Sequence, residues 1–458
     1  MLRDVLGLEP LWWLAWIAPA PLLALALRSS RLDACWITAL AALIGLSGNL
    51  RYLNLVMPAP AALLVLAAQA LLWVFVVAAT RRVVLRYRAW WSVFAYPVFW
   101  VAADQLMAGL AADGNWGSLA YSQSEFLPLL QVGALFGVPG VLFLLALAPS
   151  ALALGVVFGG TLRRARWSYG ISAALLGAAL VYGGWRLQPP AAGQPTRFGM
   201  VAIDDGIEPR TAPDKAAAIW DQYQRHVEAL AARGASVIVL PERMAVLTPA
   251  QAPAVQARFS ALARRSGSWI EAGVELDDGK GRRNLAWLFG PDGALAAHYQ
   301  KHYLAPSERA GFVAGAAFEV RRIGGHAYGL AICKDMHFAD LGRAYGARQA
   351  AVMLVPAWDF GLDRWLGARM TATRGVENGY AVVRSAREGL LTASDAYGRI
   401  LGERRSGPMP GAALLVDVAL AAPLPTLYTR IGDLLGWICV GAAAMLLVLG
   451  RRARIERG

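Results

Sequence analysis

Long stretches with almost no charge constrain this chain more than any other feature. Hydrophobic residues make up 57% of the sequence and charged residues only 16%, against roughly a quarter in soluble domains. A helix needs roughly 20 apolar residues to cross a bilayer. About seven segments fit that requirement, at about 9–27, 33–50, 57–79, 89–110, 127–158, 168–187 and 427–449. The sequence therefore predicts an α-helical membrane domain, with a buried core helix as the alternative for 33–50, which contains Asp33 and Asn49.

Arginines flank these segments and do not form one basic surface. They cluster near 28–31, 81–88, 163–166 and 451–457, in alternate loops and in the C-terminal tail. Basic residues concentrate on the cytoplasmic side of membrane proteins, so these loops and the tail are predicted to be cytoplasmic. The N-terminus and the residues from about 190 to 425 are then predicted to lie outside. The net charge of +13 reports topology, and we expect no nucleic-acid partner.

Residues 195–420 have the composition of an α/β domain. Apolar runs of strand length alternate with segments whose apolar residues recur at helical spacing, which predicts a layered α/β fold. The predicted strands are 197–203, 235–242, 268–276, 283–290, 328–336, 350–359 and 380–389, and the predicted helices are 214–234 and 254–267. The five histidines lack metal-ligand spacing and the three cysteines, Cys35, Cys333 and Cys439, imply no disulfide framework, so we expect no metal and no disulfide.

Three polar residues follow ends of predicted strands in this domain: Glu242, Lys301 and Cys333. Strand ends are where sites form in α/β sheets. A thiol is a good nucleophile as thiolate, a glutamate can move its proton, and a lysine can stabilise an oxyanion. Each residue also has a structural interpretation, as a small core hydrophobe, a loop carboxylate or a surface amine. Their joint occurrence in the order Glu, Lys, Cys favours a catalytic role over the three separate structural interpretations.

The surrounding motifs carry a resemblance. "LPE" (240–242), "KHYLAPSE" (301–308) and "ICKDM" (332–336) resemble the Glu–Lys–Cys sites of the nitrilase, or carbon–nitrogen hydrolase, superfamily, whose fold is an αββα sandwich. Apolar spans before and after such a domain are similar to one branch, the apolipoprotein N-acyltransferases. Segments 114–145 and 364–401 also resemble that branch, so the similarity covers nearly the whole chain.

The resemblance implies a domain layout and residue roles. The membrane domain would be 1–190 with about six spans, the catalytic domain 195–420, the last span 427–449 and the basic tail 450–458. Cys333 would be the nucleophile, Glu242 the general base and Lys301 the oxyanion partner. Glu308 would support the triad and Lys334 would add positive field. The possible substrate contacts are Trp358, for which packing in the fold is the alternative, and Tyr121.

The function implied is N-acylation at a membrane. A phospholipid would donate an acyl chain to the cysteine, and the α-amino group of a lipoprotein's N-terminal diacylglyceryl-cysteine would take it. The expected protein is a monomer without a cofactor, multi-pass in the bacterial inner membrane, with its catalytic domain in the periplasm. Lys334, Asp335 and Arg243 depart from the family pattern. Lys334 and Arg243 favour an alternative enzyme that acylates another membrane amine or hydrolyses an amide. A catalytically silent binding or assembly relative is the third possibility.

Overall fold

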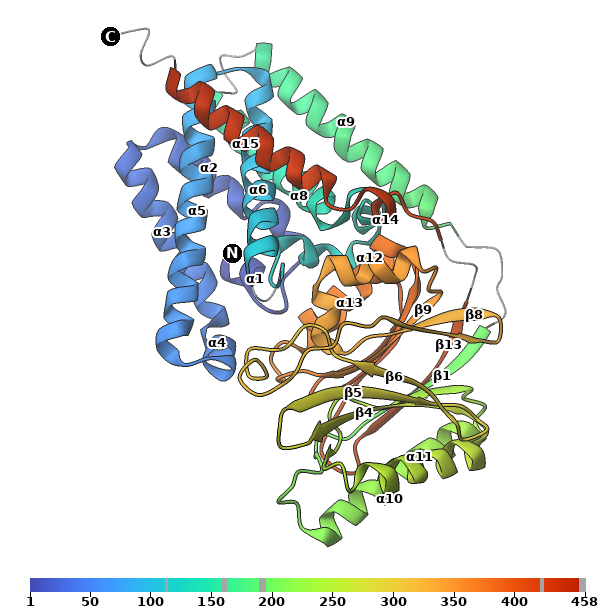
Figure 1. Cartoon of the computed structure of the whole chain (residues 1–458). Coiled ribbons are helices and arrows are strands. Elements are labelled where there is room, and N and C mark those ends of the chain that lie inside the picture. The colour runs from blue at the N-terminus through green and yellow to red at the C-terminus, as the bar shows by residue number, and fades with distance from the viewer. Residues whose placement is uncertain (112–113, 159–162, 189–194, 421–423, 453–458) are drawn as a thin grey trace. The chain divides into compact units, whose positions relative to one another are not determined.

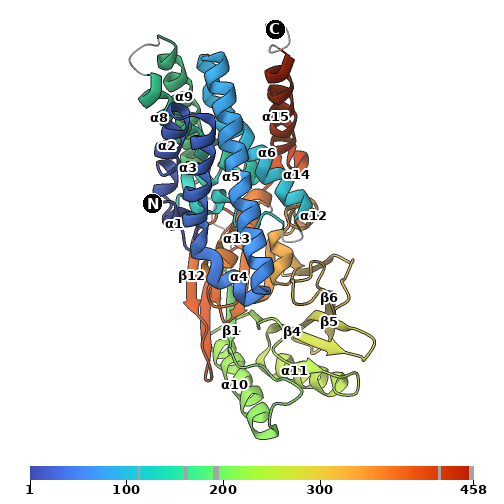
Figure 2. The same ribbon diagram turned by 90° about the vertical axis from the view of Figure 1, so that its left-hand side faces the viewer.

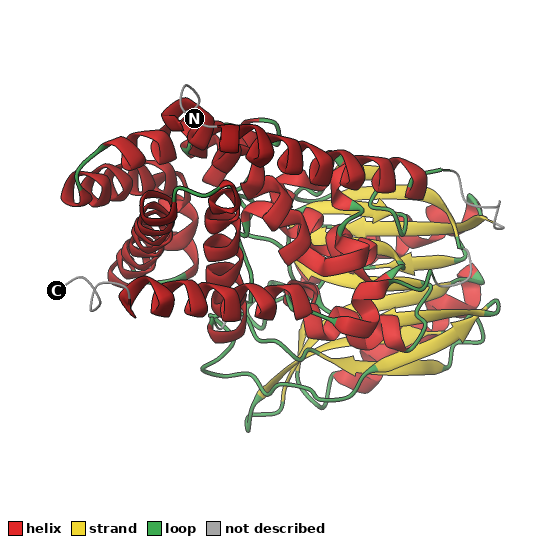
Figure 3. Ribbon diagram, turned by 90° about the horizontal axis from the view of Figure 1, so that it is seen from above, coloured by secondary structure: helices red, strands yellow, loops and turns green. Residues whose placement is uncertain are grey.

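The computed structural model of the chain describes residues 1–111, 114–158, 163–188, 195–420 and 424–452 (Figure 1). The chain divides into two compact units, Met1–Gln188 with Arg430–Gly458, and Pro189–Thr429. All strands of the described residues belong to the second unit, and the first is helical (Figure 3). The predicted basic tail from residue 453 onward lies outside the described residues.

The first unit contains long apolar helices. Its helices are α1 (Arg3–Leu6), α2 (Pro19–Arg28), α3 (Arg31–Leu46), α4 (Leu50–Val56), α5 (Ala59–Tyr87), α6 (Ala95–Leu110), α7 (Leu127–Leu130), α8 (Gly133–Phe158), α9 (Arg163–Arg186) and α15 (Leu434–Arg452). Figure 2 shows α3 and α5 side by side. Along α5, Leu66 and Trp73 are buried while Leu64 and Leu71 are exposed, as expected of a helix with one face on lipid.

Four helical stretches of the described residues are long and apolar enough to cross a membrane. They are Arg31–Val56, Ala59–Tyr87, Trp90–Leu110 and Gly133–Phe158. Leu14–Arg28 and Leu434–Leu449 are shorter apolar helices. Within the first predicted span, 9–27, the stretch from Leu14 begins with a 3-10 turn, Leu14–Trp16, and the α-helix starts at Pro19, where a proline is tolerated in the first turn. The run 427–449 breaks between α14 (Leu427–Ile431) and α15, where Gly432 has φ 57°.

The second unit contains two sheets. The seven-stranded sheet has the order β13-β1-β2-β4-β5-β6, with β3 paired to β4, and the six-stranded sheet has the order β12-β11-β10-β9-β8-β7. The first sheet consists of β1 (Pro195–Ala202), β2 (Val237–Val239), β3 (Val246–Leu247), β4 (Trp269–Asp277), β5 (Arg282–Phe289), β6 (Leu295–Gln300) and β13 (Ala412–Ala419). The second consists of β7 (Glu319–Ile323), β8 (His326–Leu330), β9 (Val352–Trp358), β10 (Ala381–Arg387), β11 (Leu390–Ser394) and β12 (Ile400–Arg405).

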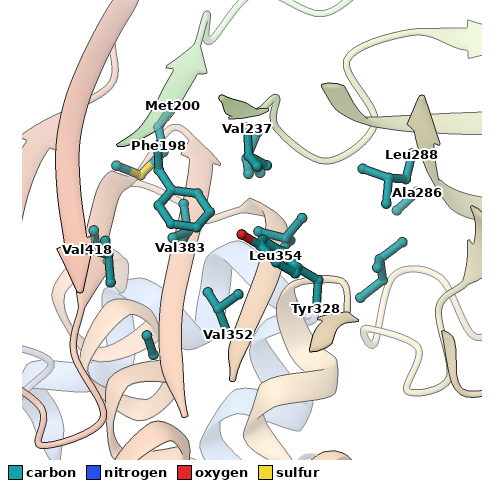
Figure 4. Packing of buried hydrophobic residues seen from close by; sticks show 14 of the residues in the cluster. Phe198, Met200, Val237, Ala286, Leu288, Tyr328, Val352, Leu354, Val383 and Val418 are labelled. Carbon is teal, nitrogen blue, oxygen red and sulfur yellow. The ribbon is translucent and has the colours of Figure 1, made fainter. Parts of the chain in front are cut away.

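Alternate residues of these strands pack into different hydrophobic clusters. Val352 and Leu354 of β9 join Phe198 and Val237 of the first sheet in one cluster, so the sheets share a core (Figure 4). The intervening Met353 faces the other way, into a cluster with residues of α12 (Ala339–Ala347). Both faces of these central strands are thus covered, which explains their near-continuous apolar sequences.

Helices of the second unit agree with the sequence pattern. α10 (Pro213–Ala232) and α11 (Ala252–Ser266) pack against the first sheet and confirm the predicted helices 214–234 and 254–267. α11 ends at Gly267 with φ 66°, a left-handed conformation that glycine adopts without strain. α13 (Arg364–Asn378) connects β9 to β10, which are parallel. Parallel pairing brings the carboxyl ends of such strands to one edge of the sheet.

Candidate active site

Glu242 lies three residues beyond β2, where the first sheet meets the second. Its backbone N–H donates to the carbonyl of Ala357 in β9, with 3.2 Å between nitrogen and oxygen. The Glu242 residue is 2% exposed. The loop after β2 is therefore fixed against the strand that leads to Trp358.

Lys301 follows β6 directly and joins two carboxylates. Its Nζ lies 2.7 Å from Oε1 of Glu242 and 2.9 Å from Oε2 of Glu308. The backbone N–H of Ala305 also donates to Glu308 Oε2, at 2.7 Å, which orients that carboxylate. An ammonium has three N–H donors. The two carboxylates use two of these donors.

Asn284 is a residue of this group that the sequence analysis missed. It lies in β5, and its Nδ2 donates to Glu242 at 2.6 Å and to Glu308 at 2.8 Å. The available signal was a polar residue within the apolar run "NLAWLFG". A buried amide in a strand needs partners, and here they are the two glutamates.

The charges of this group stabilise one another. Burial lowers the pKa of the Lys301 ammonium, but the Glu242 and Glu308 carboxylates offset this, so the pKa is raised overall. Burial raises the pKa of Glu308, and Lys301 more than compensates, so that pKa is lowered. Lys301 is therefore an ammonium and Glu308 a carboxylate at neutral pH.

Cys333 begins the 3-10 helix Cys333–His337 with a backbone φ of 43°, in the left-handed region. The predicted strand 328–336 is too long, because β8 ends at Leu330 and the chain turns at the cysteine. The Cys333 thiol donates to the backbone carbonyl of Trp358, with 3.5 Å between Sγ and oxygen. The turn thus presents the thiol at the end of β9.

Asp335 holds this turn in place. Its carboxylate accepts from the backbone N–H of Ile332 at 2.9 Å and of Tyr303 at 2.8 Å, and from the hydroxyl of Tyr299 at 2.7 Å. Tyr303 lies two residues after Lys301. Asp335 therefore fixes the cysteine turn to the segment that carries the lysine, and the sequence analysis assigned it no such role.

The Cys333 thiol is in a setting that keeps it protonated at rest. Burial raises its pKa, and the charges of Glu242 and Asp359 act in the same direction. Lys301 and Arg384 lower the pKa without offsetting burial. Arg384 also pairs with Asp359, its Nη1 lying 3.0 Å from Oδ2. Because a neutral thiol is a weak nucleophile, attack by Cys333 requires a base to take its proton.

Two further candidates lie in the same unit. Lys334 is buried, at 6% exposure, and its charge adds to burial in lowering the pKa of His337. Trp358 ends β9, and its ring lies 4.0 Å from the guanidinium carbon of Arg387 and 5.0 Å from that of Arg243. An effect of Lys334 on the thiol and a substrate contact of Trp358 stay predictions.

Tyr121 belongs to the first unit. It is buried, and its hydroxyl donates to Oδ1 of Asn115 at 2.6 Å. Its role in substrate contact also stays a prediction. Across the described parts of the chain, no group of three or more His, Cys, Asp or Glu side chains could hold a metal ion.

Comparisons with known proteins match a different family to each of the two units. Residues 5–151 match the apolipoprotein N-acyltransferase N-terminal domain, and residues 206–403 match the carbon–nitrogen hydrolase family. The chain is 30% identical over 503 residues to an apolipoprotein N-acyltransferase of Gloeobacter violaceus, covering 99% of this chain and 93% of that protein. It is 28% identical over 400 residues to one of Geobacter metallireducens, covering 79% and 75%. Among solved structures, an amidase from Nesterenkonia sp. is 23% identical, with a TM-score of 0.42, covering 51% of this chain and 93% of the amidase.

Proposed function

The chain belongs to the apolipoprotein N-acyltransferase family, and from that premise we propose that it N-acylates lipoproteins at a bacterial membrane. A phospholipid donates an acyl chain to Cys333, and the α-amino group of an N-terminal diacylglyceryl-cysteine receives it. The observation that carries the proposal is the buried Glu242–Lys301–Glu308 group, whose Glu242 and Lys301 charges act on the Cys333 thiol.

The first half-reaction forms a thioester. Glu242 takes the thiol proton as the Cys333 sulfur attacks the carbonyl carbon of the phospholipid ester. The carbon–sulfur bond forms, the carbon–oxygen bond breaks, and Glu242 returns the proton to the departing lysophospholipid oxygen. Lys301 offers its remaining N–H to the carbonyl oxygen, which becomes negative in the tetrahedral intermediate.

The second half-reaction reverses the roles. The lipoprotein amine attacks the thioester carbon, Glu242 accepts a proton from the nitrogen, and the sulfur leaves. The carbon–nitrogen bond of the amide replaces the carbon–sulfur bond, and the proton returns to Cys333. These steps are all carried by side chains of this chain, so the proposal includes no metal and no organic cofactor.

The finer architecture is part of the proposal. We assign an αββα sandwich to 195–420, about seven spans to 1–190 and 427–449, and a basic tail to 450–458. The arginine distribution supports a multi-pass protein of the inner membrane with the sandwich in the periplasm. A monomer suffices, because Glu242, Lys301 and Cys333 all belong to one compact unit.

The test is a pair of single-turnover assays on the purified full-length protein. Labelled phospholipid should give an acyl adduct on wild type, detected by intact mass, and none on Cys333→Ala. Cys35→Ala and Cys439→Ala are the matched controls and should acylate normally. Glu242→Gln should slow both adduct formation and transfer to a diacylglyceryl-cysteine peptide by about 10²–10⁴-fold.

Three outcomes would replace the proposal. An adduct on Cys333→Ala would move the nucleophile elsewhere. A thioester that water releases faster than the peptide amine does would indicate an amide or ester hydrolase. Absence of any adduct on correctly folded wild type would favour a binding or assembly role.

A further inference from the structure

Several buried N–H groups of the second unit have no acceptor within the described residues, and two of them are Nε1 of Trp358 and Nε of Arg387. β9 and β10 are parallel, and their register places Trp358 opposite Arg387. Paired residues of neighbouring strands project to the same face of a sheet. Two unsatisfied donors therefore lie together, and each costs free energy unless a ligand accepts from it.

Arg387 is also a buried cation without a counter-ion. It is 4% exposed, and its Nη1 donates to the backbone carbonyl of Arg243 at 2.7 Å. Within the described ranges, no carboxylate forms an ion pair with it, although Glu208 and Glu388 act on it from further away. Burial lowers the pKa of the Arg387 guanidinium, and the charge of Arg243 adds to this. A charge in such a place is expensive unless an anion neutralises it.

Neighbouring arginines increase the positive charge. Arg243 pairs with Glu275, with 2.5 Å between Nη2 and Oε2. Arg282 shares the same carboxylate at 3.5 Å. We call these three residues, Arg243, Arg282 and Arg387, the arginine cluster. Its three guanidinium groups have ion pairs with only one carboxylate, that of Glu275, among the described residues.

The Arg387 guanidinium lies close to the backbone of Gly206 and to Trp358, whose carbonyl contacts Cys333. A Cβ on Gly206 would lie 2.7 Å from Arg387 Nη1, so the guanidinium lies against the backbone at this glycine. The carbonyl of Trp358 accepts from the Cys333 thiol, and its ring lies against Arg387. An anion held by these donors would be next to the site of thioester formation.

We propose that Arg387 and the Trp358 indole N–H, with Arg243 beside them, bind the phosphate of the donor phospholipid. The inference rests on the proposed function and deepens it by naming what positions the donor. A phosphodiester has an anionic charge and several acceptor oxygens, which match a guanidinium fork and an indole N–H. Glycerol keeps this phosphate only a few bonds from the ester that Cys333 attacks, so one anchor orients the reacting carbon.

The experiment compares two donors that differ in phosphate. Phosphatidylglycerol and diacylglycerol with the same acyl chains are presented in mixed micelles to the full-length protein, and adduct formation is followed. Arg387→Gln should raise KM for phosphatidylglycerol at least tenfold, the loss expected for a charge-assisted hydrogen bond, and leave diacylglycerol within twofold. Trp358→Phe keeps the ring, removes the N–H and should have a smaller effect of the same selectivity.

The matched control is Arg258→Gln. Arg258 lies over the ring of Trp220 at 5.3 Å and pairs with Asp221 on an exposed surface, so it reproduces the cation–aromatic contact without the buried donors. It should not change either KM. Arg387→Lys retains the charge and should recover part of the phosphatidylglycerol selectivity.

Inorganic phosphate distinguishes a lipid head group from a free ion. It should compete with phosphatidylglycerol in wild type and not in Arg387→Gln. Equal losses with both donors would overturn the proposal in favour of a structural role. Phosphate binding without competition would indicate a site for the free ion, and a loss confined to transfer would indicate a carboxylate of the peptide acceptor. If neither donor acylates wild type, the proposed function fails instead.

Discussion

Asn284 donates hydrogen bonds to both glutamates that contact Lys301. Its amide donates to both Glu242 and Glu308, so each carboxylate has a neutral donor besides the ammonium. Asn284→Ala should lower the acylation rate by about tenfold or more, since a hydrogen bond to a charged group contributes about 1.5–3 kcal/mol. Because the Asn284 hydrogen bond helps to lower the pKa of Glu308, its loss should raise that pKa.

The measurement is the pH profile of single-turnover acylation. The acid limb should move to higher pH in Asn284→Ala, because the Glu308 carboxylate then takes up its proton at higher pH. If the rate fell equally at every pH and the acid limb stayed at the same pH, the prediction would be contradicted, and Asn284 would have a structural role only.

For single residues, the sequence could predict which polar side chains follow strand ends. It could not predict which other side chains they contact in the fold. Glu242, Lys301 and Glu308 lie in short motifs, and the structure brings all three together. Asn284 contacts residues 42 and 24 positions away. Asp335 contacts Tyr303 and Tyr299, 32 and 36 positions away. No local sequence pattern encodes contacts of this kind. The unpaired state of Arg387 is likewise a property of the packed fold.

At the scale of elements, β4 contains a buried carboxyl group without a hydrogen-bond partner among the described residues. Glu271 is 0% exposed, and neither of its carboxylate oxygens has a hydrogen-bond partner in the described structure. Its register partners, Val239 and Leu288, belong to the core between the sheets. Burial raises the pKa of Glu271 well above its usual value.

Glu271→Met should therefore stabilise the second unit. A raised folded pKa means that the folded state binds the proton more tightly than the unfolded chain does. The stability that protonation supports is complete below pH about 4.3 and is lost as pH rises toward the folded pKa. The gain in unfolding temperature of Glu271→Met over wild type should hence be larger at pH 8 than at pH 5, as tryptophan fluorescence during heating would show. A constant difference would indicate that Glu271 is ionised in the fold.

Strands and helices of the second unit could be predicted because burial on both faces gives continuous apolar runs. The errors occur where a side chain ends an element. Asp335 accepts from the N–H of Ile332 and ends the run that the apolar pattern extended to residue 336. In the first unit, Pro19 begins α2 well inside the predicted span, since apolar composition does not show where a helix starts.

For the molecule as a whole, the arginines predict its topology. The test starts from a variant in which alanine replaces Cys35, Cys333 and Cys439. A single cysteine is then introduced in place of Lys280, which is exposed in the β4–β5 turn, or of Arg86, which is exposed near the end of α5. A membrane-impermeant maleimide should label position 280 in spheroplasts and should label position 86 only after lysis. Labelling of position 86 in sealed spheroplasts would invert the orientation and place the catalytic unit in the cytoplasm.

The left-handed turn at Cys333 has a consequence for how the protein can be improved. A side chain at φ 43° costs about 1–2 kcal/mol, and Arg243 and Glu388, at 48° and 47°, have the same conformation around the site. Between two variants that both lack the thiol, Cys333→Gly should unfold about 2–4 °C above Cys333→Ala, since glycine relieves the turn. Selection for heat resistance alone would therefore favour loss of the proposed nucleophile, and a thermostable enzyme of this kind has to gain its stability elsewhere in the fold.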